Sequence, residues 1–268
     1  MKQRSGGALI GRRDELARLR EAILARQSLL VHGRSGAGKT ALLTETLSGL
    51  PEHMRRKCLM CTGVENPRTL WRSLALLLAK AGDGQVMSRW ERECAGTRCM
   101  DRWICEQTSL RLRGILRRAL QESAYWVILD ALARVPDGAC PLLEEWIWSR
   151  RTPVILAGRG STEQELGRAA RLFWHRGMRM ELLPLGDADR KALLEQAIHR
   201  FGLAEVADED FRRFVLKSSQ GLPGRIIRLC ELACQNAYQW HGRIKLHTLA
   251  VDFLRQADSC PRSLRLAS

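Results

Sequence analysis

Short apolar runs and segments with helical spacing alternate along the first two thirds of the chain. The apolar runs predict five buried strands, at residues 28–32, 57–62, 125–130, 153–157 and 178–183. Helices are predicted between these runs, at residues 41–47, 67–80, 110–122, 140–149 and 162–174. Alternation of this kind predicts an α/β domain, in which a mostly parallel sheet carries helices on both faces.

The pattern changes after Pro184. Segments 188–201, 208–218, 223–240 and 244–256 all have helical spacing, and no strand is predicted between them. Asp187 and Asp208 suit helix N-caps, and Gly202 suits a helix end. We therefore predict an α/β core at 1–186, a small all-helical lid at 187–258 and a C-terminal tail at 259–268. Within the core, residues 82–108 have no clear period, and we interpret them as an insertion.

One octapeptide carries the clearest chemical signal. It is Gly33-Arg34-Ser35-Gly36-Ala37-Gly38-Lys39-Thr40, which matches the phosphate-binding loop (P-loop) pattern G-x-x-x-x-G-K-[ST] in full. The glycines let the backbone wrap around an anion, and the N-terminus of the following helix adds positive potential. Lys39 can reach the β- and γ-phosphates, and the Thr40 hydroxyl can ligate Mg²⁺. The octapeptide therefore predicts a site for ATP and Mg²⁺, with Gly33, Ser35, Gly36, Ala37, Gly38, Lys39 and Thr40 as binding residues.

Asp130 is the second candidate of this site. It follows four apolar residues at the end of the predicted third strand, which is the form of a Walker B strand, and a carboxylate there can hold Mg²⁺ through water. Many strands also end in aspartate as a turn residue. The next residue is Ala131, where many related ATPases have a glutamate that polarises the attacking water. We therefore expect slow hydrolysis. Glu144 and Glu145 are possible substitutes, although a solvated helix face also explains them.

Four arginines are further candidates for contact with phosphate. Arg159 ends the predicted fourth strand, where ligands of parallel sheets bind, and could stabilise charge on the γ-phosphate. Arg225 opens a helix of the lid and could reach the phosphates of the same subunit. Arg171 and Arg176 are candidates for an arginine finger that enters a neighbouring subunit. A surface arginine or a plain helix start also explains these positions.

The net charge of +15, from 44 basic and 29 acidic residues, points to nucleic acid or another anionic surface as a partner. Residues 187–258 carry 11 basic and 10 acidic side chains, so the excess belongs to the rest of the chain. No run of eighteen apolar residues is present, and no apolar segment typical of export follows the basic N-terminus. With nine scattered cysteines, this composition predicts a cytoplasmic protein with reduced thiols and no membrane partner.

Together these motifs resemble the AAA+ ATPases and their signalling relatives, the STAND ATPases. The stretch Ala8–Leu16 resembles the box that precedes the phosphate loop in these families and packs near adenine, which adds Ile10, Gly11 and Arg12 to the nucleotide site. Gly221-Leu222-Pro223 resembles the sensor turn of the lid, and residues 182–186 resemble the crossing from core to lid. The resemblance covers about residues 8–258. It implies a five-stranded parallel sheet in the order 5-1-4-3-2.

Two branches of these families fit the sequence. One is the origin-recognition and transposition-regulator branch (the TniB and TnsC type), which assembles on DNA with ATP bound. The other is the STAND branch, where the ATPase is a protein-interaction switch within a longer chain. The sequence leaves no room for a winged helix after the lid and lacks a large sensor domain, and Ala131 departs from both patterns. A small-molecule kinase is a third reading, against which the four lid helices argue.

If DNA binds, the resemblance to the first branch places it on the basic stretch 89–118. This stretch holds Arg89, Arg92, Arg98, Arg102, Arg111, Arg113, Arg117 and Arg118 against four acids, and we select Arg111, Arg113 and Arg117 as candidates. Their phosphate contacts would be independent of sequence and sensitive to salt. An amphipathic helix with a solvated basic face is the alternative. Trp90 and Trp103 could stack on separated bases, although packing also explains them. The expected assembly is a homo-oligomer, a ring or filament, on duplex DNA that recruits a protein partner.

Overall fold

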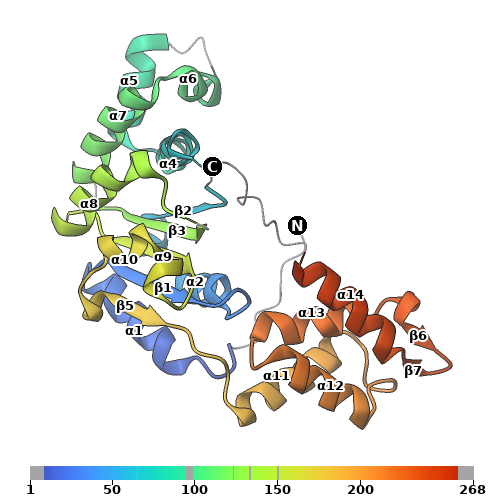
Figure 1. Ribbon diagram of the computed structural model, residues 1–268. Helices are drawn as coiled ribbons and strands as arrows, with labels where there is room; N and C mark the ends of the chain where they lie inside the picture. Colours follow the sequence, from blue (N-terminus) through green and yellow to red (C-terminus); the bar gives the residue numbers. More distant parts are fainter. Residues whose placement is uncertain are drawn as a thin grey trace, which may run out of the picture. The chain divides into compact units, whose positions relative to one another are not determined.

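Figure 1 shows a computed structural model of the chain, which describes residues 9–64, 66–94, 99–122, 124–132, 134–149 and 151–258. Ala8, Arg98 and the predicted tail 259–268 lie outside the described residues. The chain divides into two compact units. The first unit runs to Ser35 and continues over Lys39–Leu183, and the second combines Gly36–Gly38 with the residues from Pro184 onward. The division thus follows Leu183, whereas the sequence pattern places it near residue 186.

The first unit is built on a five-stranded parallel sheet. Its strands are β1 Leu29–Gly33, β2 Cys58–Thr62, β3 Trp126–Leu132, β4 Val154–Arg159 and β5 Arg179–Glu181. Their order is β2-β3-β4-β1-β5, and every neighbouring pair is parallel, which confirms the predicted fold class and strand order. All five residues of β1 are buried, because helices cover both faces of the sheet.

The helices of the first unit alternate with these strands. They are α1 Arg13–Leu24, α2 Lys39–Ser48, α3 Glu52–Arg55, α4 Pro67–Lys80, α5 Gly84–Cys94, α6 Met100–Glu106, α7 Ser109–Glu122, α8 Cys140–Ser149, α9 Glu163–Leu166 and α10 Arg168–Leu172, with short 3-10 turns at Asp137–Ala139 and Arg176–Met178. The bounds of α4 and α8 are those predicted. Asn66 caps α4 by accepting a hydrogen bond from the backbone nitrogen of Thr69.

Two segments of this unit differ from the prediction. Residues 82–108 contain the helices α5 and α6, whose period was missed because few apolar residues mark it. In α5 only Val86, Trp90 and Cys94, spaced four residues apart, face the core. The helix predicted at 162–174 is broken into α9 and α10 at Gly167, whose backbone has φ 52° and ψ −117°. Such a conformation stops a helix and is open to glycine.

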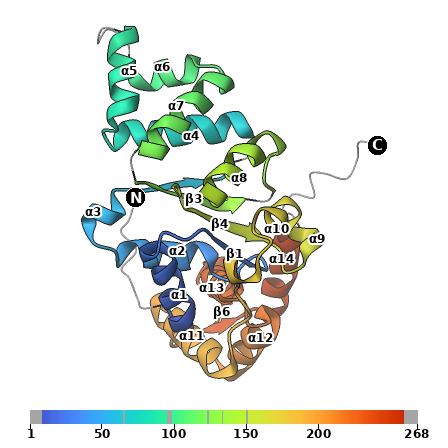
Figure 2. The same ribbon diagram turned by 90° about the vertical axis from the view of Figure 1, so that its left-hand side faces the viewer.

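The direction of each crossover sets the layers. The connection from β1 to β2 runs across the sheet in the opposite direction to the later connections, so right-handed crossovers put its helix α2 on the opposite face from α4 and α8. Figure 2 shows this arrangement, with α1 and α2 on one side of the sheet and α4, α7 and α8 on the other. The larger core lies on the second side, where the buried rings of Trp71 in α4 and Trp146 in α8 meet edge to face at 6.2 Å.

The second unit is mostly helical but not entirely so. Its elements are α11 Asp187–Arg200, α12 Glu209–Ser219, α13 Pro223–Ala233, a 3-10 turn at Asn236–Tyr238, β6 Gln239–Trp240, β7 Arg243–Ile244 and α14 Leu246–Asp258. The prediction of an unbroken helix at 223–240 and an all-helical lid was therefore wrong. An antiparallel hairpin, β6–β7, separates α13 from α14. Strands of two residues are too short to show an alternating pattern, so the sequence did not reveal them.

Helix ends in the second unit follow their local chemistry. Asp208 is the N-cap of α12, where its carboxylate accepts a hydrogen bond of 2.8 Å from the backbone nitrogen of Phe211, as predicted. Asp187 is not a cap. Gly186 holds that position, and Asp187 lies in the first turn of α11 with an ion pair of 2.9 Å to Arg190. Gly202 follows α11 with a φ of 67°, as expected at a helix end.

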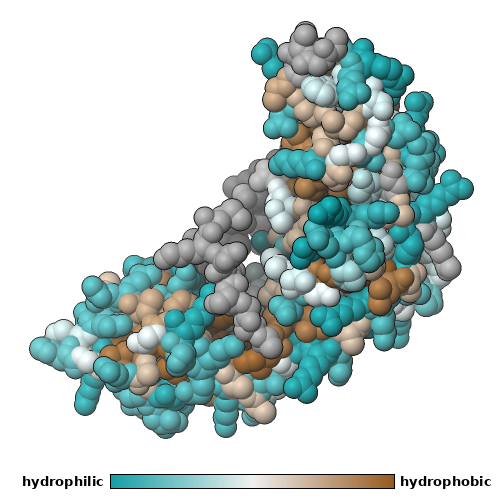
Figure 3. Space-filling model, turned by 180° about the vertical axis from the view of Figure 1, so that it is seen from behind, coloured by the Kyte–Doolittle hydropathy of each residue, from teal (hydrophilic) through white to brown (hydrophobic). Residues whose placement is uncertain are grey.

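The face seen in Figure 3 is mostly hydrophilic, with smaller apolar patches between the hydrophilic side chains. Among the described residues, no helix combines the length and the apolar character needed to cross a bilayer.

Candidate nucleotide site

The phosphate-binding loop connects the end of β1 to the start of α2. Gly33, Gly36 and Gly38 have φ values of 147°, 84° and 96°, a region that side chains other than glycine rarely adopt. At Gly33 there is also no room for a side chain. A Cβ built there would lie 2.7 Å from the carbonyl oxygen of Leu182. The glycines of the motif are therefore required by backbone geometry, independently of any ligand.

Replacing Gly33 by alanine is expected to destabilise the protein. The methyl group meets a backbone oxygen and a strained φ, so the free energy of unfolding should fall by about 1–3 kcal/mol. Thermal melting of the nucleotide-free protein measures this loss. Gly63→Ala is the matched control, because Gly63 has a φ of 65° but a Cβ there would have no atom within 4 Å. Equal losses of stability in both variants would contradict the role of the contact with Leu182.

Lys39 is the cation of the loop. Its side chain is buried, and its Nζ donates hydrogen bonds of 2.7 Å to the carbonyl of Gly33 and 3.0 Å to that of Arg34. Burial, and next the nearby charge of Arg159, lower the pKa of Lys39 to about 8, whereas Asp130 acts in the opposite direction. The ammonium group is held in an environment that disfavours its charge, as expected for a site that anionic phosphate would complete.

Asp130 lies near the carboxyl end of β3. It is 2% exposed, and among the described residues its Oδ1 has no hydrogen-bond partner. A buried carboxylate oxygen without a partner is costly unless a cation or water meets it. Together with the Lys39 cradle, this oxygen fits a magnesium–nucleotide group. Lys39 and the loop amides would bind the phosphates, and Thr40 and Asp130 would hold the Mg²⁺, which would supply charge neutralisation of the phosphates when bound.

Arg159 ends β4, where its backbone lies opposite Gly33 in the sheet. It is exposed, and its charge acts on Lys39 together with that of Asp130. The structure therefore brings Lys39, Asp130 and Arg159 together at the carboxyl edge of the sheet, where parallel α/β sheets bind ligands. This is the position that the sequence predicted for all three.

Comparison with known proteins agrees with the phosphate loop, the strand that carries Asp130 and the order of the strands. The AAA ATPase domain family matches residues 8–152, which is more than half of the chain. The chain belongs to the AAA ATPase family. Membership implies that it binds nucleotide and that it is an ATPase of the AAA+ type. No curated protein matches the sequence.

Solved structures show the same fold at low identity. The Orc1 protein of Aeropyrum pernix, solved in complex with DNA, is 18% identical with a TM-score of 0.64, over 94% of this chain and 67% of that one. Cdc6p of Pyrobaculum aerophilum is 14% identical with a TM-score of 0.60, over 91% and 66%. A STAND protein of Pyrococcus horikoshii with a tetratricopeptide repeat sensor is 14% identical with a TM-score of 0.50, over 94% and 33%. The chain thus spans about two thirds of the Orc1 and Cdc6p chains.

Ala131, the residue after Asp130, lies in an irregular part of β3. It has a φ of 57°, and the register between β3 and β4 shifts between Leu129 and Leu132. A β-bulge therefore follows Asp130, and a residue with a Cβ occupies the left-handed region at its centre. Of the two glutamates that the sequence offers for activating water, Glu145 contacts α7, with an ion pair of 2.8 Å to Arg117 and a hydrogen bond of 3.0 Å from Gln121. Glu144 is exposed on α8.

The box before the loop has a structural role in this AAA ATPase. Gly11 has a φ of 68°, and the buried Arg12 forms an ion pair of 2.7 Å with Glu15 and donates a hydrogen bond to the carbonyl of Leu183. These contacts explain the Gly-Arg-x-x-Glu spacing without a ligand, and contact of Ile10, Gly11 and Arg12 with adenine stays a prediction. Arg225 lies in the first turn of α13 and donates a hydrogen bond of 3.3 Å to Gln220. Its contact with phosphate also stays a prediction.

One of the two arginine-finger candidates lines a groove that the sequence did not reveal. Arg171 and Arg176 are exposed, and Arg171 lines a groove of about 950 Å³ together with Arg134, Arg168 and Trp174. The ring of Trp174, which is 62% exposed, stacks on that of the exposed Trp148 at 5.9 Å. Both tryptophans lie in segments predicted as helices, and nothing in a sequence marks a tryptophan as exposed.

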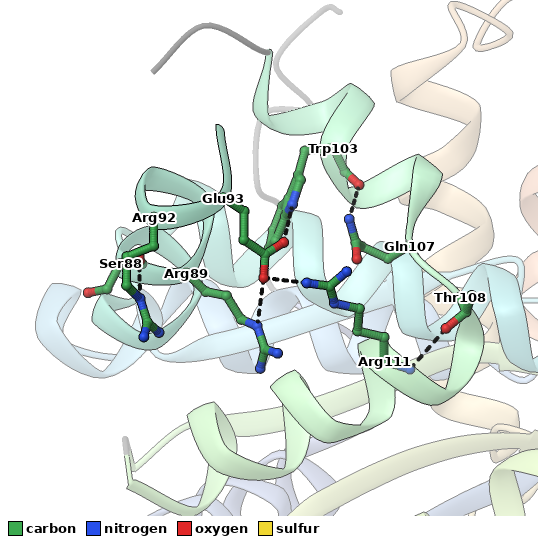
Figure 4. Close-up of polar contacts among 8 residues, drawn as sticks. All are labelled: Ser88, Arg89, Arg92, Glu93, Trp103, Gln107, Thr108 and Arg111. Carbon is green, nitrogen blue, oxygen red and sulfur yellow. Dashed lines mark hydrogen bonds and ion pairs between the residues drawn. The ribbon is translucent and has the colours of Figure 1, made fainter. Parts of the chain in front are cut away.

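The basic helices carry fewer uncompensated charges than the sequence implies. Figure 4 shows Glu93 of α5 at the centre of a cluster, where it accepts a hydrogen bond of 3.0 Å from the Trp103 indole and pairs with Arg89 at 3.2 Å and with Arg111. Burial opposes the charge of Glu93, but the hydrogen bonds from Trp103, Arg89 and Arg111 outweigh it and lower the pKa of Glu93. Trp103 is buried, so it packs in the core and cannot stack on bases.

Of the three DNA-binding candidates, Arg111 and Arg117 are thus in ion pairs, with Glu93 and Glu145. Arg113 is half-buried on α7, and no ion pair of the described residues involves it. The pairs of Arg111 and Arg117 are surface pairs, since the two arginine side chains are 45% and 58% exposed. Pairs of this kind contribute about 0–1 kcal/mol, so a phosphate group can displace the carboxylate at little cost.

Proposed function

We propose that this AAA ATPase is a regulator that assembles on duplex DNA when ATP and Mg²⁺ are bound, and that it recruits a protein partner. The observation that carries the proposal is that the net positive charge lies outside the predicted lid, residues 187–258. The residues outside 187–258 hold nearly all of the net charge of +15, and α7 presents arginines on its solvent side. Nucleotide bound by Lys39 and Asp130 would act as the switch for assembly. Cytoplasmic location and the transposition-regulator branch belong to the same proposal.

Support for DNA as the partner comes from the chemistry of α7. Arginine contacts to phosphate give affinity that is independent of sequence, and the pairs with Glu93 and Glu145 are weak enough to exchange. The Orc1 structure of similar fold was solved with DNA. That likeness concerns the fold, and its DNA suggests the class of ligand to test first.

Support for self-assembly comes from the groove beside α10. Exposed tryptophans and arginines are enriched at protein interfaces, and the stacked pair Trp148–Trp174 lies next to Arg171. We propose that this face meets a second copy of the chain, so that Arg171 or Arg176 reaches the nucleotide of its neighbour. Such a finger would stabilise charge on the transferred phosphoryl group.

Removing three of the arginines on α7 is expected to weaken binding to duplex DNA at least tenfold. The variant is Arg111→Gln with Arg113→Gln and Arg117→Gln, and loss of three phosphate contacts should lower the slope of log affinity against log salt by about 2–3. Filter binding to a duplex with ATP and Mg²⁺, over a range of salt, measures both. ATP affinity should stay unchanged.

The matched control removes three exposed, ion-paired arginines of the second unit. Arg213, Arg228 and Arg255 each pair with an acid three residues away, and replacing all three by glutamine changes the net charge equally. This control should bind DNA like the wild type. Equal weakening in both triple variants would show that net charge alone matters, and absence of any duplex binding at low salt with ATP would overturn the proposal.

Ala131 favours a second candidate function, a STAND-like switch that binds ATP, hydrolyses it slowly or not at all, and contacts protein without a DNA role. A glutamate that activates water is absent at this position, and a fold likeness to a STAND protein exists. The two candidates differ in their response to DNA. A switch of this second kind would show no change in ATP turnover or assembly when duplex is added.

A further inference from the structure

The hairpin of the second unit ends in an exposed tryptophan. Gln239 pairs with Ile244 and Trp240 pairs with Arg243, and the turn between them consists of His241 and Gly242. Both turn residues have positive φ values, 46° and 72°, as in the tight turns that suit the twist of two-residue hairpins. Figure 1 shows the hairpin beside α14.

The base of the hairpin is fixed to the second unit. Tyr238 is buried and donates a hydrogen bond of 3.0 Å from its hydroxyl to Asp252 of α14. The backbone nitrogen of Lys245 donates 2.8 Å to the carbonyl of Tyr238, and the amide of Gln239 donates 3.0 Å to that of Ala233. Ile244 is buried in the same core. The tip is therefore presented on a fixed support.

The other face of the hairpin points to solvent. Trp240 is 65% exposed, and because cross-strand partners share a face, Arg243 lies on the same face as Trp240, opposite Ile244. Lys245 follows β7, and its Nζ donates a hydrogen bond of 3.4 Å to the carbonyl of Ala237. Both cations are exposed. Within the described part of the chain, the aromatic ring that contacts Trp240 is that of the neighbouring His241, with ring centres 4.6 Å apart and planes at 62°. A tryptophan left in water on a fixed turn gains little in the free protein, so its surface is available for a ligand.

The segment that contains the hairpin carries positive charge and no negative charge. The twenty residues 232–251 contain no acid, whereas Arg243, Lys245 and two histidines lie among them. The two acids that flank the segment are engaged, Glu231 with Arg228 at 2.6 Å and Asp252 with Tyr238. The unit as a whole is nearly neutral, so this is a local positive surface around one aromatic ring. A ligand that complements this surface is an anion that also has a flat apolar face.

We propose that the hairpin tip binds single-stranded DNA, with the ring of Trp240 stacked on an unpaired base and Arg243 and Lys245 on the flanking phosphates. An aromatic ring beside cations is the arrangement that tracks single strands, since every base has a face on which to stack. In a duplex those faces are covered by neighbouring bases. The inference rests on the proposed function in that DNA is the partner, and it assigns the second unit a contact separate from the α7 arginines.

The test uses the full chain and a fluorescein-labelled thymidine 20-mer, with a 20-base-pair duplex beside it. Wild type should bind the single strand with quenching of tryptophan fluorescence. Trp240→Ala should weaken this binding about tenfold or more and reduce the quenching, Trp240→Phe should retain most of the affinity, and Arg243→Gln should lower the salt slope by about 0.7. Leu24→Ala is the matched control, because Leu24 is an apolar side chain that is 63% exposed in the other unit. It should bind like the wild type.

The outcomes separate this inference from the proposed function. If Trp240→Ala binds the 20-mer like the wild type, or weakens duplex and single strand equally, the assignment of the tip to single strands is overturned. ATP-dependent binding to duplex that still depends on the α7 arginines would then leave the proposed function standing. If the α7 variant retains duplex binding while Trp240→Ala loses the single strand, the inference holds and the proposed duplex contact fails.

Discussion

Replacing Lys39 by methionine is expected to abolish ATP binding and, at the same time, to raise the melting temperature of the nucleotide-free protein by about 2–4 °C. The first effect follows from the loss of the cation that meets the phosphates. The second follows from its pKa, which burial and Arg159 lower from 10.5 to about 8. Keeping this ammonium group charged at pH 7 costs about 3 kcal/mol. Its hydrogen bonds to Gly33 and Arg34 offset part of that, leaving about 1 kcal/mol to be gained.

The pH dependence of the same residue gives an independent check. Below pH 8, Lys39 is charged in both the folded and the unfolded chain, and its cost is present in full. Between pH 8 and 10.5 the unfolded chain binds the extra proton, so stability of the wild type rises with pH relative to Lys39→Met. Binding of ATP requires the charged form, so its affinity should fall about tenfold per pH unit above pH 8.

Lys39→Arg is the matched control for this behaviour. Arginine stays charged throughout, so whatever ATP affinity the variant retains should not fall between pH 8 and 10 on account of this position. Thermal melting with and without ATP and titration with a fluorescent ATP analogue measure both quantities. Unchanged ATP affinity in Lys39→Met, or a lower melting temperature of its nucleotide-free form, would contradict the assignment of Lys39 as the strained cation of the phosphate loop.

Introducing a glutamate at Ala131 is expected to raise ATP turnover at least tenfold, with ATP affinity unchanged. A positioned general base typically contributes a factor of 10²–10⁴, and the wild-type chain has none at this position. The left-handed φ of Ala131 already accommodates a Cβ, so glutamate meets the same backbone strain as alanine. Steady-state phosphate release at saturating ATP and Mg²⁺ is the measurement.

Ala131→Gly is the control that distinguishes an effect on ATP turnover from relief of backbone strain at this position. Glycine adopts a φ of 57° freely, so this variant should melt at the same or a higher temperature, although glycine in an ordinary strand costs about 0.5–1 kcal/mol relative to alanine. It should not turn over ATP faster. Fast turnover in the wild type, or equal acceleration by glycine and glutamate, would show that water is activated from elsewhere in the site.

The resemblance to the AAA+ ATPases implied the order of the sheet. The sequence pattern itself predicted the five strands and the bounds of α4 and α8, because buried strands and amphipathic helices leave clear periods. It also placed Lys39, Asp130 and Arg159 at one edge, because the carboxyl ends of parallel strands meet there. It failed where few residues carry the signal. The helix α5 shows three core residues in eleven, and the strands of the hairpin are two residues long. Neither gives a period that can be read.

Contacts between distant residues were also beyond the sequence. The ion pairs of Arg111 and Arg117 depend on how α5, α7 and α8 pack. The stacking of Trp148 on Trp174 joins a segment that precedes β4 in the chain to one that follows it. Residue type indicates that these side chains carry charge or aromatic surface. Only the fold determines whether that charge is compensated and whether that surface meets solvent.

The hydrogen bond from Arg12 to the carbonyl of Leu183 joins two residues 171 positions apart. It places the point where the chain enters the first unit beside the point where it leaves. The two ends of this unit therefore lie side by side. Units of this kind tolerate transfer into another chain and circular permutation. The segment from residue 9 to Leu183 is therefore a module that engineering could move into another chain or reconnect end to end.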